Sequence, residues 1–508
     1  MSYLGIDIGT TAVKALAVDE SARVLARSEV EVSLLSEGSA GREQDPEELW
    51  SAVKKAVKQA AAGVSADPVK AMAFSAAMHG LLALDENKEP LTRQITWADG
   101  CAEGEARELR ETEDARGIYR RTGCPVQALY YPARLRRLRR EKPDVFSRAA
   151  FFCSVKELFI HRLTGRFMMD RSMASSLGVL NTHEKEWDQK TLEIAGIGPE
   201  RFPPLVSPLS RIEGISGKAA EETGLPKDVV VVPGAGDGGL ANVGSGATAP
   251  GQVAATIGTS GAMRLISKQP IIDPEERTWC YYLADDTWYV GGAINSGGIV
   301  FRWVRDSLFP DVVNTSKEHG IEPYEILTRE AASTPPGADG LIMLPYLMGE
   351  RTPYWNPDAR GVVFGLNTRH TRAHLARAAL EGTCFAMANI LRVLEPAAET
   401  VSEIRASGGF MRSPLWVRIL ADVLGYPVSI PETQEGSAMG AALFAMLATG
   451  RIESIARINE LIPAKESITP DPDNHELYKE LYEIFAELYP KVEELYNRLG
   501  RFREKESS

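Results

Sequence analysis

The sequence predicts an α/β protein built from two domains of similar design, and three observations lead to this prediction. The chain has 508 residues, which is more than one hydrophobic core usually serves. Short apolar runs typical of strands alternate with helical patterns. Two segments, "YLGIDIGTTAVKALAVD" (3–19) and "QVAATIGTSGAMRLIS" (252–267), repeat an apolar strand, a Gly-Thr-Thr/Ser turn and a second apolar strand. Since such a repeat is typical of duplicated domains, we expect domains at 1–247 and 248–508.

The composition narrows the class of partner. Hydrophobic residues make up 44% of the chain and charged residues 25%, as in an ordinary globular enzyme. The net charge of -12 opposes binding to nucleic acid or to anionic lipid, so we expect a small-molecule partner and neither nucleic acid nor membrane. The five cysteines are far apart, with no pair at metal-ligand spacing, and read as reduced thiols. With no long apolar run or signal peptide in the sequence, we expect a cytoplasmic protein.

The first domain is expected to open with the hairpin at 3–19. The segment "DPEELWSAVKKAVKQAAAG" (45–63) predicts a helix that is capped by Asp45. The strand pattern "VKAMAFSA" (69–76) follows it and completes a βαβ unit. Further on, "DVVVVPGAG" (228–236) is a continuous apolar run that ends in glycines, as expected of a strand buried on both faces.

Three segments of the second domain have distinct patterns. In "ASGGFMRSPLW" (406–416), paired glycines follow a strand pattern and offer either a flat backbone surface for a purine or a simple turn. The small residues of "GSAMGAALFAM" (436–446) predict a helix that packs very close to another backbone. Leu and Tyr recur at helical spacing in 474–500, which predicts a terminal helix on the surface.

The Gly-Thr-Thr turn next to Asp7 is a candidate phosphate site. Such a hairpin tip offers unobstructed N–H groups and two hydroxyls to phosphate oxygens. A carboxylate would repel bare phosphate, so Asp7 makes sense there if Mg²⁺ lies between them. The alternative is a hairpin whose Asp and Thr residues only satisfy turn hydrogen bonds. Two such hairpins facing one cleft favour the phosphate site.

Asp237 in "GAGDGG" (234–239) is the candidate catalytic residue. The segment matches G-x-G-x-x-G, but no Asp or Glu occurs between Asp237 and Asp273 to bind a ribose, so we exclude a dinucleotide site. A P-loop motif is also absent from the sequence. At the end of a buried strand, Asp237 could take the proton from a sugar hydroxyl during phosphoryl transfer. The alternative is an Asp that caps the following helix.

Three residues of the first domain are candidates for contact with a small substrate. His79 follows the strand at 69–76, and Trp97 with Asp99 in "ITWADG" pairs an aromatic ring with a carboxylate, which suits a polyol. A structural histidine and a capping aspartate remain open as alternatives. The basic run "RLRRLRREKP" (134–143) is interpreted as a solvated helix face, and the loop "LPYLMGERTPYWNP" (344–357) has no assigned role.

Four of these motifs resemble, over nearly the whole chain, those of the FGGY carbohydrate kinases, a branch of the actin-like ATPases. "GIDIGTTAVKA" looks like the first phosphate motif of that family and "TIGTSGAMR" like its second. "GVVFGLNTRHTRAHLARAALEG" looks like its C-terminal signature and "ASGGFMRSPLWVRILADVLGYPV" like its adenosine motif. The resemblance implies two actin-like (ribonuclease H-like) domains around a central cleft. It also implies transfer of the γ-phosphoryl group from ATP, with Mg²⁺, to a sugar hydroxyl.

The resemblance assigns roles to individual residues. It places Asp7 at the magnesium ion and Asp237 at the reacting hydroxyl as catalytic base. The residues implied for the phosphates are Thr10, Thr11 and Lys14. Those implied for the rest of the nucleotide site are Thr259, Gly298, Arg302, Gly409 and Ser413. The sugar is expected to contact Met78, His79, Trp97, Asp99 and Asp237.

Within the family the motifs look most like those of the gluconate kinases. Xylulose kinases share Met-His-Gly but usually carry Asn where this chain has Gly238. Arg134 stands where the family usually has a lysine. The expected reaction is therefore ATP-dependent phosphorylation of a sugar acid, D-gluconate to 6-phosphogluconate, with xylulose or another FGGY substrate as the alternative. A non-catalytic actin-like ATP-driven switch is a remote alternative, and a homodimer is left open.

Overall fold

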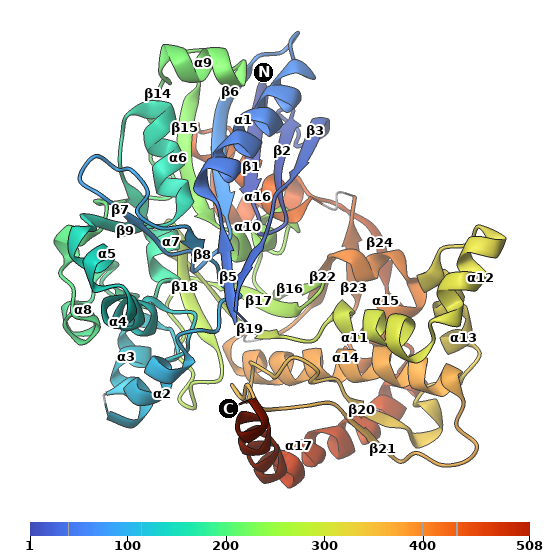
Figure 1. Ribbon diagram of the computed structural model, residues 1–508. Helices are drawn as coiled ribbons and strands as arrows, with labels where there is room; N and C mark the ends of the chain where they lie inside the picture. The colour runs from blue at the N-terminus through green and yellow to red at the C-terminus, as the bar shows by residue number, and fades with distance from the viewer. Residues whose placement is uncertain (39, 113, 399, 433–434, 508) are drawn as a thin grey trace. The chain divides into compact units, whose positions relative to one another are not determined.

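Figure 1 shows the computed structural model, which describes residues 1–38, 40–112, 114–398, 400–432 and 435–507. The chain divides into two units. Unit 1 comprises Met1–Ala249, Ile266–Val290 and Glu435–Pro463, and unit 2 comprises Pro250–Leu265, Gly291–Gln434 and Ala464–Ser508. The first crossing lies within a few residues of the division expected at 247/248. Two later segments, which the sequence prediction gave to the second domain, pack with unit 1.

Unit 1 is built on a mixed sheet that contains the predicted hairpin and βαβ unit. The sheet order is β14-β15-β6-β1-β2-β3. β1 and β2 are antiparallel, whereas β6 is parallel to β1 and β15 is parallel to β6. The parallel strands therefore end at one edge of the sheet. The strands are β1 (Ser2–Ile8), β2 (Ala12–Val18), β3 (Val24–Glu31), β6 (Val69–Ala76), β14 (Ile212–Glu213) and β15 (Val230–Gly236).

Helix α1 (Pro46–Ala62) covers one face of this sheet over β2 and β3, as its sequence predicts. Asp45 is its N-cap and accepts a hydrogen bond from the N–H of Glu47 at 2.8 Å. The predicted apolar face of Leu49, Val53 and Val57 is buried. Helical spacing and capping chemistry together therefore fix this crossover.

Helix α16 (Gly436–Ala448) lies beside β1 and α10 (Asp237–Gly244), at very short range (Figure 1). A Cβ atom on Gly440 would lie 2.0 Å from the carbonyl oxygen of Leu240 in α10. A Cβ atom on Gly5 of β1 would lie 1.9 Å from the carbonyl oxygen of Ala438. This confirms the close packing predicted from the small residues, and it explains why 435–463 belong to unit 1.

In unit 2 a second hairpin and a parallel strand repeat the centre of unit 1. β16 pairs with β17 in antiparallel fashion and with β22 in parallel fashion, as β1 does with β2 and β6. The sheet order is β18-β19-β17-β16-β22-β23-β24, and the chain passes from one unit to the other within β17 and β19. The strands are β16 (Gln252–Ile257), β17 (Gly261–Ser267), β18 (Trp279–Ala284), β19 (Thr287–Ile294), β22 (Glu403–Ser407), β23 (Val428–Pro431) and β24 (Ala464–Ile468).

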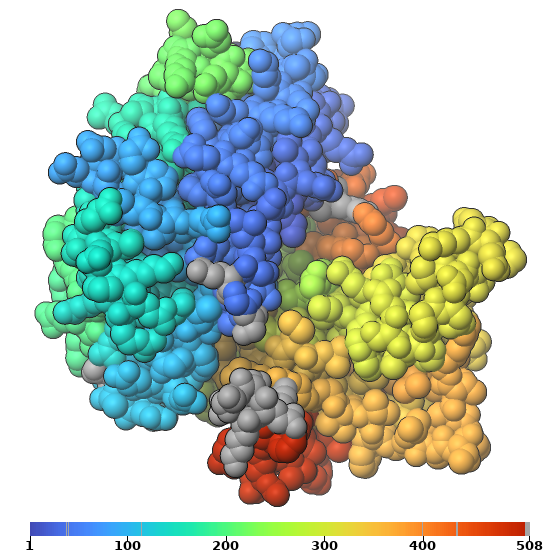
Figure 2. All heavy atoms as spheres, viewed as in Figure 1, coloured from blue at the N-terminus to red at the C-terminus, as the bar shows by residue number. Residues whose placement is uncertain are grey.

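The helices of unit 2 pack around α14 (Arg372–Leu394), which contacts α13 (Pro323–Ala332), α15 (Pro414–Leu424) and β20 (Ile342–Leu344). Helix α12 (Asp311–His319) and α13 present much of their surface to solvent (Figure 2, yellow). The predicted terminal helix is α17 (Pro472–Ser507), which packs against α14, α15 and β20. It is longer than the apolar pattern indicated.

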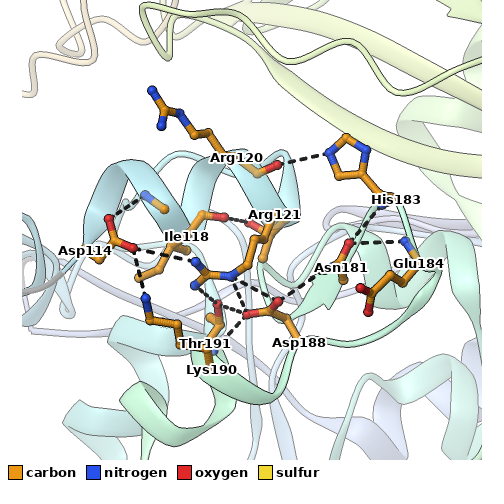
Figure 3. Close-up of polar contacts among 12 residues, drawn as sticks. Asp114, Ile118, Arg120, Arg121, Asn181, His183, Glu184, Asp188, Lys190 and Thr191 are labelled. Carbon is orange, nitrogen blue, oxygen red and sulfur yellow. Dashed lines mark hydrogen bonds and ion pairs between the residues drawn. The ribbon is translucent and has the colours of Figure 1, made fainter.

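A polar network in unit 1 ties helix α3 (Ala115–Thr122) to α8 (Gln189–Ala195) (Figure 3). Arg121 Nε donates to both carboxylate oxygens of Asp188, at 3.0 and 3.1 Å, and Asp188 also caps α8 through the N–H of Thr191. Burial disfavours the charged carboxylate, but the hydrogen bonds from Thr191 and Arg121 outweigh it and hold the pKa of Asp188 below its usual value. The network therefore joins the last turn of α3 to the N-terminus of α8.

The close packing of α16 makes Gly440→Ala a test of the fold. Alanine usually stabilises a helix relative to glycine, but here the added methyl group meets the α10 backbone. We expect the free energy of unfolding to fall by about 1–3 kcal/mol, measured by urea denaturation.

Gly104→Ala in α2 (Glu103–Thr112) is the matched control, because no atom lies within 4 Å of the added Cβ. This variant should gain up to about 1 kcal/mol. Equal stabilisation of both variants would contradict the packing of α16.

Candidate active site

Asp7 lies near the end of β1, opposite Lys14 of β2 in the hairpin register. Its Oδ1 accepts a hydrogen bond from the buried Ser75 hydroxyl of β6 at 2.7 Å. Burial and the negative charge of Asp237 raise the pKa of Asp7 to about 6, while Ser75 and Lys14 act in the opposite direction. The two carboxylates, at the ends of β1 and β15 on either side of β6, are thus held within electrostatic range of each other.

Asp237 is the first residue of α10, directly after β15. The N-cap position of α10 is Gly236, so Asp237 is not the N-cap residue, and its role as base stays a prediction. Its Oδ1 accepts the N–H of Gly238 at 2.8 Å, and its carbonyl accepts from the Ser437 hydroxyl of α16 at 3.3 Å. The carboxylate of Asp237 is therefore held by the first turn of α10, and its carbonyl group by α16.

The first hairpin tip is held by residues that the sequence reasoning missed. The buried Gln44, in β5 (Gly41–Gln44), donates from Nε2 to the carbonyls of Gly9 and Thr10, at 3.3 and 3.2 Å. These bonds leave Thr10 and Thr11 at the tip, between β1 and β2. Lys14 Nζ lies 3.4 Å from Glu435, which directly precedes α16. No local pattern marks Gln44 or Glu435, because each acts on a residue far away in the sequence.

Met78 and His79 form the turn after β6. A Cβ atom on Gly236 would lie 2.7 Å from Met78 Cγ, so Met78 lies against the strand end that carries Asp237. The His79 backbone has φ 65°, an unusual conformation for a non-glycine residue that is often found at functional sites. Its buried ring places Nδ1 2.7 Å from the carbonyl oxygen of Ser176. Because a carbonyl only accepts, Nδ1 carries a proton.

Trp97 and Asp99 follow β8 (Gln94–Ile95) and differ in exposure. Trp97 is 38% exposed, whereas Asp99 is 5% exposed. The Asp99 carboxylate accepts the N–H groups of Arg42 and Cys101, both at 3.0 Å. These bonds hold the turn at Asp99, and sugar binding by Asp99 stays a prediction.

Arg134 departs from the interpretation of its basic run as a solvated helix face. It belongs to α4 (Tyr131–Glu141) and is 2% exposed. Its guanidinium donates to the carbonyls of His79, Ala128, Thr96 and Asp99. Burial lowers the pKa of Arg134 to about 10. The residue thus joins the His79 turn to the Trp97 segment.

In unit 2 the second hairpin tip carries Thr259, which is exposed. The turn before α11 (Gly298–Trp303) packs on it: the N–H of Gly298 donates to the Gly258 carbonyl at 2.7 Å. A Cβ atom on Gly298 would lie 2.7 Å from that same oxygen, so only glycine fits there. Arg302 lies exposed on α11.

The segment after β22 carries the residues predicted for the adenosine site, and this role stays a prediction. Gly408 has φ 101°, and its Cβ position lies 2.5 Å from the Ile257 carbonyl oxygen of β16. Gly409 is exposed, with nothing within 4 Å of its Cβ position, as expected of a surface that a flat ring could approach. The Ser413 hydroxyl caps α15 by accepting the N–H of Trp416 at 3.3 Å. This capping role is an alternative to nucleotide contact for Ser413.

The carboxylates of unit 1 suit magnesium carried by a nucleotide. Among the residues that the structure describes, no three His, Cys, Asp or Glu side chains gather as ligands for a metal ion. Mg²⁺ is commonly bound by one or two carboxylates together with substrate phosphates. Asp7, with Asp237 nearby, fits that donor set.

Both parts of the chain match models of carbohydrate kinases. Residues 2–244 match the N-terminal domain and residues 253–449 the C-terminal domain of the FGGY family of carbohydrate kinases. The chain belongs to this family, and it is a carbohydrate kinase; the resemblance seen in its motifs is confirmed. Carbohydrate kinases of this family use ATP, typically with Mg²⁺. No helix in the described part of the chain is long and apolar enough to cross a membrane.

Individual relatives come from two substrate groups. The gluconokinase of Bacillus subtilis (strain 168) is 37% identical over 94% of this chain and 93% of its own length. A xylulose kinase of Staphylococcus epidermidis is 29% identical, with 94% of each chain covered. Among solved structures, a gluconate kinase from Lactobacillus acidophilus has a TM-score of 0.92 at 31% identity, over 98% of this chain and 99% of its own. The fold is therefore the predicted two-domain actin-like fold.

The buried contacts of Arg134 lead to a prediction about the sugar side of unit 1. In Arg134→Lys a compact ammonium group replaces the planar fork and cannot reach all of the same carbonyls. We expect the free energy of unfolding to fall by about 1–3 kcal/mol and KM for the sugar to rise, with KM for ATP unchanged.

Arg137→Lys, one turn further along α4, is the control, because Arg137 is partly exposed and pairs with Glu141 at 2.7 Å. Steady-state kinetics and urea denaturation of both variants provide the measurement. If Arg134→Lys had the stability and the sugar KM of the wild type, the hydrogen bonds of Arg134 to the backbone carbonyls would contribute to neither.

Proposed function

We propose that this kinase transfers the γ-phosphoryl group of ATP to D-gluconate and forms 6-phosphogluconate. The observation that supports this most is the identity to the gluconokinase of Bacillus subtilis, 37%, against 29% to the xylulose kinase of Staphylococcus epidermidis, at similar coverage. Gly238 directly after the candidate base agrees with it, since xylulose kinases usually carry Asn there. The gluconate specificity is the part of the function that needs a direct test.

In the proposed mechanism Asp237 accepts the proton of the attacking hydroxyl. Its fixed backbone at the end of β15, next to Met78, suits a general base that must meet one hydroxyl group. Met78, His79 and Trp97 would orient the sugar, with Asp99 holding their loop. Bound Mg²⁺ would neutralise phosphate charge, with Asp7 as its carboxylate contact. Thr10, Thr11 and Lys14 would bind phosphate oxygens.

The remaining nucleotide contacts are proposed for unit 2. Thr259 and Gly298 would face the phosphates, and Gly409 would leave space for the adenine ring. Arg302 and Ser413 are retained as nucleotide contacts, with the capping bond of Ser413 as the alternative role. We place the sugar site and the first hairpin in a domain of residues 1–247. The second hairpin and the adenosine site belong to a domain of residues 248–508. Because the cysteines are free thiols, the proposal places the enzyme in the reducing cytoplasm.

A xylulose kinase is the second candidate, and one observation favours it. A xylulose kinase from Lactobacillus acidophilus has a TM-score of 0.92 at 32% identity. The gluconate kinase of that organism has the same TM-score. Similarity of the backbone therefore does not distinguish a gluconate kinase from a xylulose kinase. The substrate must be determined by the side chains that contact the sugar.

A substrate panel separates these candidates. We expect the highest kcat/KM for gluconate when gluconate, xylulose, ribulose and glycerol are compared in a coupled assay of ADP release. A higher kcat/KM for xylulose would contradict the proposed specificity for gluconate, but the protein would still be a carbohydrate kinase. If ADP is released at the same rate with every sugar and without any sugar, the result would support the non-catalytic ATP-driven switch instead.

Asp237→Asn tests the base directly. The amide keeps an acceptor for the Gly238 N–H but takes up no proton, so kcat should fall by about two to four orders of magnitude. Gluconate affinity and thermal stability should change little. Turnover near that of the wild type in a folded Asp237→Asn protein would remove Asp237 as the base.

A further inference from the structure

The loop at 347–356 contains a buried acid that the proposed mechanism does not use. Glu350 is 2% exposed, and its Oε1 accepts the N–H groups of Asn295 at 2.9 Å and Arg351 at 2.7 Å. Oε2 has no hydrogen-bond partner among the described residues. Burial raises the pKa of Glu350 to about 7, against the effect of the two N–H groups. Burying a carboxyl group with an unpaired oxygen costs folding free energy, and such groups are often found at functional sites.

The loop holds the turn at 295–298, which joins β19 to α11. Beside the Glu350 bond, the Asn295 side chain donates to the Met348 carbonyl at 3.1 Å. The N–H of Met348 in turn donates to the buried Ser296 hydroxyl at 3.2 Å. Loop and turn are therefore joined by backbone and side-chain bonds in both directions.

The other side of this turn rests on the second hairpin. The N–H of Gly297 donates to the Thr259 carbonyl at 3.0 Å, and that of Gly298 to the Gly258 carbonyl. A Cβ atom on Gly297 would lie 2.5 Å from the Ser260 carbonyl oxygen. The 295–298 turn and the second hairpin are in close contact, with no space between them. A shift of the turn therefore moves the hairpin tip.

The loop itself is fixed from its far side by helix α17. The rings of Tyr354 and Tyr489 are stacked, with centroids 3.4 Å apart and planes 9° apart. Asn356 Nδ2 donates to the Tyr489 hydroxyl at 3.0 Å. Glu350 thus acts from an anchored loop, and its carboxylate is able to set the position of the turn.

We propose that Glu350 is a positioning residue for the second phosphate hairpin: its carboxylate fixes the 295–298 turn and through it the backbone of Gly258 and Thr259. The inference rests on the proposed nucleotide role of that hairpin. A hydrogen bond to a carboxylate is about twice as strong as one to a neutral acceptor, so the anion holds the turn more firmly. Nucleotide affinity should therefore depend on the charge of Glu350.

The surroundings of Glu350 contain few groups that could titrate with it. Arg351, on the same loop, favours the charged form. Burial raises the pKa values of Tyr346 and Tyr354 above their usual range, so both phenols stay neutral. The turn presents the neutral Asn295 and Ser296. A change in nucleotide binding near pH 7 that Glu350→Gln abolishes is thus assigned to this carboxyl group.

The two possible roles of Glu350 predict opposite pH trends. Because its pKa is raised on folding, Glu350 contributes less to stability as the pH rises from about 4.5 to about 7. A positioning role predicts the reverse for function: nucleotide affinity rises around pH 7, where the anion forms in the folded protein. A variant that is neutral throughout should therefore be as stable as the wild type or more stable at pH 8, and yet bind nucleotide less well.

The experiment compares Glu350→Gln with the wild type by calorimetric titration of MgADP at about pH 6 and about pH 8. At pH 8 we expect Kd to be about five- to twentyfold weaker in the variant, with gluconate KM and the thermal midpoint retained. At pH 6 the two proteins should approach each other. Glu350→Asp keeps the charge on a shorter side chain and should recover part of the affinity.

Glu157→Gln in unit 1 is the matched control, since burial also raises the pKa of Glu157 to about 7 and its carboxylate also accepts a backbone N–H. It should bind MgADP as the wild type does at both pH values. Wild-type affinity of a folded Glu350→Gln protein at pH 8 would overturn the proposal. So would equal losses in both variants. Failure of gluconate as a substrate would leave the MgADP result intact, so the two proposals fail separately.

Discussion

The contact of α16 with β1 and α10 is the constraint on which the arrangement of unit 1 depends. Backbone meets backbone there, at Gly5 on β1 and at Gly440 on α16. The same helix brings Ser437 to the Asp237 carbonyl and Glu435 to Lys14. One helix, which begins at residue 436, thus positions the first hairpin, the candidate phosphate site, together with the candidate base. Its small residues make this possible, because larger side chains would separate the three backbones.

Burying Asp7 and holding it near Asp237 both have an electrostatic cost. The pKa of Asp7 is raised to about 6, above its ordinary value of 3.8, so the folded state loses stability as the pH rises through that range. Such destabilised groups are typical of functional sites, where a ligand relieves the repulsion. The magnesium nucleotide proposed for this site would be a ligand of this kind. The proposed binding, rather than folding, would then account for the arrangement.

The sequence predicted the local features of the fold well and the long-range ones poorly. Alternating apolar residues and capping chemistry are local, so both hairpins, α1 and the strand before Asp237 are where we expected them. The return of 266–290 and 435–463 to unit 1 depends on close packing between distant segments. Spacing alone does not reveal which segment a small-residue helix will meet. The division at 247/248 was predicted from a Gly-rich segment, which is also a local signal.

The candidate site shows the same division. Asp7 and Asp237 stand at strand ends next to glycines, where sequence patterns reveal them. Arg134 looked like one more charge on a basic helix, yet it is buried because backbone carbonyls from two turns converge on it. Glu350 gave no signal beyond its place in an aromatic loop. Residues that act through backbone hydrogen bonds to distant turns leave no spacing to detect.

The central claim is that Asp237 meets the hydroxyl that receives the phosphoryl group. A crystal structure of the protein with gluconate and a non-hydrolysable ATP analogue with Mg²⁺ tests this most directly. We predict that a carboxylate oxygen of Asp237 lies about 2.6–3.2 Å from the oxygen of the gluconate 6-hydroxyl. Gluconate bound in that ternary complex with its 6-hydroxyl out of hydrogen-bond reach of Asp237, directly or through one water, would contradict the account.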